Sequence, residues 1–174
     1  MPRMKSFLEA SPFTSNLIEK KTIRLVPLKS KVSVNLGQIH VTPFEVPHRN
    51  ELSETAGFKI SGSEKNVIYL PDIDSWDGWE EELFELVRGN DYLLIDGTYY
   101  DKSEIKSRNV KEIPHPEVSE TIKLFSSASY SDKGKIFFTH FNHTNTAIQD
   151  GSDDQKKVVG EGFNLLVENK VFKI

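Results

Sequence analysis

Cysteine is absent from the 174 residues of this chain. Its absence excludes disulfide bonds, a nucleophilic thiol and every thiolate metal site, so any bound metal must be held by His, Asp or Glu. The ten glycines form neither a G-x-G-x-x-G nor a G-x-x-x-x-G-K pattern, and the G-x-S-x-G turn of many serine hydrolases is also missing. The sequence therefore predicts neither a glycine-rich phosphate-binding loop nor a serine nucleophile of this type.

Long apolar runs and basic clusters are missing as well. No stretch approaches the ~18 apolar residues of a membrane span, and the opening MPRMKSFLEASPF lacks the apolar core of a signal peptide. We therefore expect a soluble cytoplasmic protein with no membrane partner. The net charge is -4, and no basic stripe is interleaved with aromatics, which disfavours nucleic acid as a partner and a tRNA-processing nuclease as a function. A small polar organic molecule fits better as substrate.

The middle of the chain has the pattern of a β-sheet. Short β-branched or aromatic runs alternate with period two and are separated by Gly, Ser, Asn and Lys, which predicts consecutive strands and hairpins. These runs cover residues 22–28, 31–37, 38–46, 57–62 and 66–72.

Helices and apolar strands alternate in the second half. Trp79, Leu83, Leu86 and Val87 share one face of a predicted amphipathic helix that ends at Gly89-Asn90. The continuous apolar runs DYLLI and KIFFT are typical of strands buried on both faces. The remaining expected elements are a short helix at 3–9, a turn at 15–19, helices at 115–128 and after residue 151, and strands near FNLLV and KVFKI.

This order predicts an α/β (α+β layered) fold, with helices covering one face of a sheet. No linker, internal repeat or low-complexity segment interrupts the chain. We therefore expect residues 1–174 to form a single domain, or one half of a larger one.

Polar side chains follow the predicted strands at their carboxyl ends. They are His48, Asp72, Asp96, His140 and His143. In open α/β sheets ligands bind in the crevice outside these strand ends, so convergence is expected. Imidazole and carboxylate together suit a divalent metal such as zinc or iron. The chain has no H-x-H or H-E-x-x-H motif, so the ligands would have to come from distant segments.

Each of these residues also has a purely structural interpretation. His48 could stabilise a turn, and Asp72 could be the N-cap of a helix beginning near Trp76. Asp96 could be a turn residue, and His140 a core histidine with a hydrogen-bond partner. Spacing alone leaves both interpretations open.

Two further polar segments are candidates for the same crevice. His115 lies between two prolines, which fix the direction of the ring, and it could be a loop residue or a general acid. Asn142, His143 and Asn145 belong to a polar cluster suited to hydrogen-bonding a substrate, although Asn and Thr are equally common where a strand passes into a loop.

Several blocks of the sequence carry a family resemblance. They are MPRMKSFLEASPFTSNL, VTPFEVPHRNELSETAGFKI, VIYLPDIDSWDGWEEEL, YLLIDGTYYDKSEIKSRNVKEIPHPEVSETIKLF and KIFFTHFNHTN. In these blocks the chain resembles the metallo-β-lactamase superfamily and, within it, the coenzyme PQQ synthesis protein B (PqqB) family. The VPHR-x-E-x-SET-x-GF and IPHP segments are the specific ones.

The resemblance implies an αββα sandwich with one or two metal ions at one edge of its two sheets. By similarity, His48, Asp72 and His140 fall on metal-ligand positions, His115 on a nearby acid/base histidine, and Asp96 on the residue that supports it. The implied activity is that of a metal-dependent hydrolase, or of an iron-dependent oxygenase that hydroxylates a tyrosine-derived peptide in pyrroloquinoline quinone biosynthesis.

The chain departs from the family pattern at two points. The aspartate motif reads LPDID rather than the superfamily's GDT, and the H-x-H-x-D-H motif is absent. The resemblance thus covers the C-terminal half or so of the usual protein, with Met1 at an internal position. We expect either a site for one metal, or a non-catalytic interaction module. In both cases the exposed sheet face is expected to bind a second copy, as a homodimer, or a complementing N-terminal half.

Overall fold

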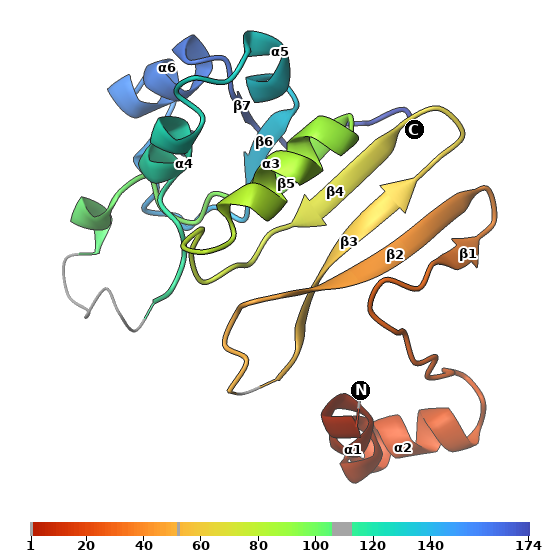
Figure 1. Ribbon diagram of the computed structural model, residues 1–174. Helices are drawn as coiled ribbons and strands as arrows, with labels where there is room; N and C mark the ends of the chain where they lie inside the picture. Colours follow the sequence, from red (N-terminus) through yellow and green to blue (C-terminus); the bar gives the residue numbers. More distant parts are fainter. Residues whose placement is uncertain (1, 52, 106–112) are drawn as a thin grey trace.

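The computed structural model describes residues 2–51, 53–105 and 113–174 and is built around one seven-stranded sheet with strand order β1-β2-β3-β4-β5-β6-β7 (Figure 1). The strands are β1 (Val34–Leu36), β2 (Ile39–Val46), β3 (Thr55–Ser61), β4 (Asn66–Leu70), β5 (Tyr92–Asp96), β6 (Ile136–Thr139) and β7 (Asn164–Leu165). The predicted α/β class is confirmed.

The sheet is half antiparallel and half parallel. Strands β1 to β4 pair antiparallel, whereas β4, β5, β6 and β7 pair parallel. Strands β2, β4, β5 and β6 therefore run in the same direction, and their carboxyl ends lie at one edge of the sheet. This edge is where ligands bind in open α/β sheets.

Four helices lie on one face of the C-terminal part of the sheet, and two lie apart from it (Figure 1). The covering helices are α3 (Glu80–Gly89), α4 (Val118–Leu124), α5 (Tyr130–Lys133) and α6 (Asp153–Gly160). The separate pair is α1 (Pro2–Ala10) and α2 (Pro12–Glu19), and short 3-10 turns occur at η1 (Lys102–Glu104) and η3 (Thr146–Ile148). No helix in the described part of the chain is long and apolar enough to cross a membrane.

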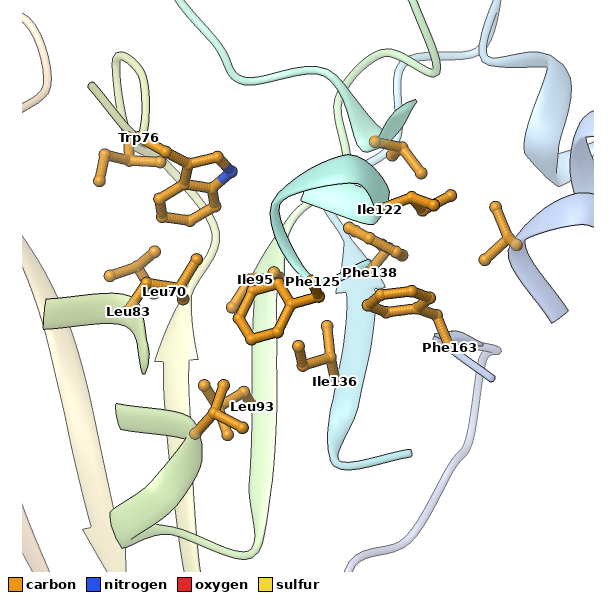
Figure 2. Close-up of a cluster of buried hydrophobic side chains, with 14 of the residues drawn as sticks. Leu70, Trp76, Leu83, Leu93, Ile95, Ile122, Phe125, Ile136, Phe138 and Phe163 are labelled. Carbon is orange, nitrogen blue, oxygen red and sulfur yellow. The ribbon is translucent and has the colours of Figure 1, made fainter. Parts of the chain in front are cut away.

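The hydrophobic core lies between the sheet and the covering helices (Figure 2). Alternate strand residues Leu93, Ile95 and Ile136 are fully buried, and Phe125 of the helical layer packs against them. Trp76 anchors the loop after β4, because its indole nitrogen donates a hydrogen bond of 2.8 Å to Thr121 Oγ1 in α4. This contact fixes the loop that carries the candidate site.

Helix α3 forms where its amphipathic pattern predicts. Leu83 and Val87 are buried on one face, and three glutamates in the first turn oppose the positive end of the helix dipole. The helix begins at Glu80 with Trp79 as N-cap. The alternative in which Asp72 caps a helix near Trp76 is therefore wrong.

Three local expectations are wrong. Residues 22–28 and 170–174 form no strand, and residues 15–19 belong to α2 rather than to a turn. Pro27 removes a backbone donor from the first segment, and β1 is already the edge strand of the sheet. Alternation alone cannot show whether a neighbouring strand is available for pairing.

Burial of β5 on both faces is also not observed. Leu93 and Ile95 are fully buried against the helices, whereas Tyr92 and Leu94, which point the other way, are only half-buried. The physical reason is that helices cover one face of the sheet only.

Candidate metal centre

His48, Asp72, Asp96 and His140 of the expected strand-end residues lie at the carboxyl edge of the sheet. His48 lies two residues after β2, Asp72 lies two residues after β4, Asp96 ends β5, and His140 directly follows β6. Strands that run in the same direction bring these four segments together although up to 92 positions separate them in sequence.

His115 reaches the same edge through a loop that is fixed against the end of β5. Tyr99 and Glu117 form an isolated parallel bridge, and the Val118 amide donates to the Tyr99 carbonyl at 2.9 Å. This registration brings His115 Nδ1 to 2.7 Å from Asp96 Oδ2.

Asp72 lies between two imidazoles. Its Oδ1 is 3.7 Å from His48 Nε2 and 3.5 Å from His140 Nδ1. Two atoms that each bind a tetrahedral metal at 2.0–2.1 Å are about 3.4 Å apart, so these spacings fit shared coordination. Asp72 also belongs, with Asp96, His115 and His140, to a group whose ligand atoms lie within 4.8 Å of one another.

Asp96 is already fully hydrogen-bonded by the protein. Its side chain is buried, and Oδ1 accepts from the Thr98 amide at 2.9 Å and from Thr98 Oγ1 at 2.7 Å. Its Oδ2 faces His115 and also accepts a longer bond of 3.3 Å from the Ile73 amide. These contacts use its lone pairs, so we assign Asp96 to orienting His115 rather than to binding metal.

Thr98 is a site residue that the sequence analysis missed. Its buried Oγ1 lies 3.3 Å from His115 Nδ1 and 3.1 Å from His140 Nδ1, in addition to its bond to Asp96. The available signal was its position two residues after a buried strand-end carboxylate, where a hydroxyl can turn back onto that carboxylate.

Asp74 is the second missed residue. Its Oδ1 lies 3.1 Å from His48 Nδ1 and accepts a bond of 3.2 Å from the Arg49 amide. The angle at His48 falls outside hydrogen-bond limits, and among the described residues this buried nitrogen has no other hydrogen-bond partner.

The pKa of His115 is shifted by opposing effects. Burial lowers it, but the hydrogen bond and negative charge of Asp96, with the charges of Asp72 and Asp74, outweigh burial and raise the pKa above its ordinary value. The shift favours the protonated imidazole relative to an exposed histidine.

Two loops of the site carry backbone in the left-handed region. His140 has φ 60 and Arg49 has φ 48, a conformation that side-chain-bearing residues adopt infrequently. Such residues concentrate at functional sites because surrounding contacts must hold them there. Here one is a candidate ligand and the other directly follows one.

The proposed substrate residues separate in the structure. Asn142 is half-buried and His143 is exposed, and Asn142 Nδ2 donates to Thr144 Oγ1 at 2.7 Å. Asn145 is fully buried, donates to the Gly97 carbonyl at 2.7 Å and accepts from the Ala147 amide at 2.8 Å. Asn145 therefore fixes the Gly97 loop, and its buried side chain does not reach a ligand.

The larger hollows of the surface lie elsewhere. One of about 600 Å³ lies between α1 and residues 24–27, and one of about 380 Å³ lies between residues 28–30 and the β2–β3 pair. Neither is lined by the histidines. Side-chain chemistry rather than cavity size identifies the site.

One protein family matches most of this chain. The family described as "Beta-lactamase superfamily domain" matches residues 2–141. A search of curated protein sequences found no match.

Solved structures support the same fold. Zn(2+)-bound PqqB from Methylobacterium extorquens has a TM-score of 0.72 at 18% identity, over 95% of this chain and 58% of that one. The metallo-beta-lactamase fold protein YhfI from Bacillus subtilis has a TM-score of 0.54 at 12% identity, over 87% of this chain and 59% of that one. The chain thus spans less than two thirds of the length of either protein.

Proposed function

Because the chain belongs to the beta-lactamase superfamily, we propose that it is a metal-dependent hydrolase whose divalent metal is held by His48, Asp72 and His140. The observation that carries the proposal is the position of Asp72 Oδ1, 3.7 Å from His48 Nε2 and 3.5 Å from His140 Nδ1. Three such ligands leave a fourth tetrahedral position for water.

The donor set fits zinc or iron, since both accept imidazole nitrogen and carboxylate oxygen. A bound divalent metal would supply a nucleophile at neutral pH by lowering the pKa of a coordinated water to about 7. PqqB was solved with zinc bound, which favours zinc as the first metal to test.

His115 is proposed as the proton donor to the leaving group. The Asp96 carboxylate holds its Nδ1 at 2.7 Å, and the raised pKa favours the protonated ring that a proton donor needs. Its other ring nitrogen, Nε2, is proposed to face the substrate. General-acid groups of this kind contribute about 10²–10⁴-fold to rate.

The likeness to PqqB supports a second candidate, an iron-dependent oxygenase step in quinone cofactor biosynthesis acting on a peptide-derived substrate. The same ligand types serve both chemistries. Asn142 and His143 are proposed to contact the substrate in either case, because they closely follow His140 in sequence and are not buried.

The test is metal content and affinity. Purified wild type should hold about one zinc or iron per chain by elemental analysis, and His48→Ala and His140→Ala should lose it. His40→Ala is the matched control, because His40 is an exposed β2 histidine that contacts only Asn35 among the hydrogen bonds described.

A His115 variant separates metal binding from proton donation. His115→Ala should keep the metal and lose most hydrolysis of chromogenic ester and phosphodiester substrates, because it removes the acid and not a ligand. Folded wild type that binds no metal, or a His115→Ala variant that loses the metal, would contradict the assignment. Hydroxylation dependent on iron and oxygen, without hydrolysis, would favour the second candidate.

A further inference from the structure

Glu104 joins the two loops that follow β5 and β6. We call residues 97–104 the first loop and residues 140–148 the second loop. Within the first loop, Glu104 Oε1 accepts a hydrogen bond of 2.6 Å from the Tyr100 amide. From the second loop, Oε2 accepts a longer bond of 3.4 Å from Thr144 Oγ1. Each oxygen of this carboxylate thus has a donor, and the two donors come from different loops.

The Glu104 position suits a carboxylate better than any other side chain of the same length. The residue is half-buried, and burial raises the pKa of its carboxyl above the ordinary value, against hydrogen bonds from the backbone of both loops, Thr146 included. An ionised carboxylate carries no donor and accepts through both oxygens. Glutamine has the same shape, but its NH2 group would meet one of the two donors.

His140 lies where the second loop begins, in a backbone conformation that needs support. Its φ of 60 is in the left-handed region, which residues with side chains adopt infrequently. Two residues further on, the Asn142 amide donates to the Thr98 carbonyl at 3.0 Å, and Asn142 Nδ2 donates to Thr144 Oγ1 at 2.7 Å. The bond to Glu104 is thus continued through two side chains to the segment that carries the imidazole.

We propose that Glu104 is a positioning residue for His140, because its carboxylate fixes the second loop against the first. This inference rests on the proposed function, in which His140 is a metal ligand. Groups that orient a ligand typically change metal affinity by about 10–100-fold when they are removed. Glu104 acts through intermediate residues, so we expect the lower end of that range, about 10-fold.

NMR of the metal-free full chain tests the link between the loops. Glu104→Gln should shift the imidazole resonances of His140. It should also speed hydrogen exchange of the Asn142 amide roughly 5-fold, the factor that corresponds to one lost hydrogen bond. Asp150→Asn is the matched control, because it removes the same charge from an exposed residue shortly after η3. Unchanged exchange of the Asn142 amide in Glu104→Gln would overturn the proposal.

Zinc titration then tests what the link does for the site. Glu104→Gln should bind zinc about 10-fold more weakly than wild type, whereas Asp150→Asn should match wild type. Val87→Ala controls for lost stability alone. It removes buried methyl groups near the amino end of β6, where Lys135 Nζ donates to the Val87 carbonyl. This variant should unfold at lower urea concentration and keep its zinc affinity.

A double-mutant cycle with Thr144→Val shows whether the two side chains act together. In that background Glu104→Gln should weaken zinc binding less than it does alone, because one of the donors is already lost. Faster exchange with unchanged zinc affinity, or an equal loss of affinity in Val87→Ala, would overturn the positioning role and leave the proposed function standing. A wild type that binds no zinc would contradict the proposed function instead, and the His140 resonances would then decide the positioning role.

Discussion

Asp74 lies behind His48, with its Oδ1 3.1 Å from the imidazole Nδ1, while Nε2 of the same ring faces Asp72 at 3.7 Å. A carboxylate on one nitrogen fixes the tautomer and direction of the ring and makes the other nitrogen a better metal ligand. The two aspartates of the LPDID segment thus have different roles. Asp72 would bind the proposed metal, and Asp74 would orient the proposed ligand His48.

Asp74→Ala is expected to weaken zinc binding by about 10–100-fold without abolishing it, as loss of a ligand-orienting partner typically does. Competition with a chromogenic chelator measures the affinity. Asp77→Ala is the control, because Asp77 is a nearby exposed aspartate for which no ion pair is described. Equal affinities for wild type and Asp74→Ala would show that Asp74 has no such role.

The metal-free protein should titrate His115 above its ordinary pKa of 6.5, because Asp96 outweighs burial. In Asp96→Asn the charge is lost and burial remains, so the pKa should fall below the wild-type value. NMR of the imidazole protons across pH 5–9 measures both values. An unchanged pKa in the variant would remove Asp96 as the cause of the shift.

The same shift links stability to pH. A raised folded-state pKa means that the His115–Asp96 pair stabilises the metal-free fold fully below pH 6.5, and that this contribution is lost as pH rises through the folded value. Urea unfolding should show a decrease in wild-type stability over this window and a flatter profile in Asp96→Asn.

Thr98→Val is expected to destabilise the protein by about 1–3 kcal/mol, because it removes a buried hydroxyl donor from Asp96 and leaves the carboxylate under-satisfied. Thr98→Ser retains the hydroxyl and should recover most of the loss. Urea unfolding at pH 7 measures both variants. If Ser and Val cost the same, the methyl packing of Thr98 matters and its hydroxyl does not.

The sequence predicts the helical layer, most strands and the edge where polar groups meet, because those features follow from local periodicity and strand direction. The α3 boundary at Gly89 and the positions of His48, Asp72 and His140 are examples. Asp74 could not be found in this way, because its importance depends on reaching His48 across the fold. Thr98 has only a local signal, its position two residues after Asp96. The prediction of a strand at 22–28 is wrong for a related reason. A strand must pair with a neighbouring strand, and the alternation of residues does not show whether one is present.

Substitution of Gly97 tests whether close packing between β5 and β6 holds Asp96 and Thr98 in place. A Cβ at Gly97 would lie 2.9 Å from Phe138 Cβ and 3.0 Å from the Thr139 carbonyl oxygen on β6. Because both are on a core strand that cannot shift cheaply, Gly97→Ala should cost about 1–3 kcal/mol. It should also weaken metal binding, since β5 and β6 carry Asp96 and His140.

Gly89→Ala is the matched control for that substitution. A Cβ at Gly89 meets nothing within 4 Å, and the residue ends helix α3. Alanine there should stabilise the protein by about 0.4–1 kcal/mol, because it restricts the unfolded chain without strain in the folded one. Paired urea unfolding and zinc titration of the two variants should give opposite signs in stability and a change in affinity for Gly97→Ala alone. Equal behaviour would mean that the β5–β6 contact does not position the site.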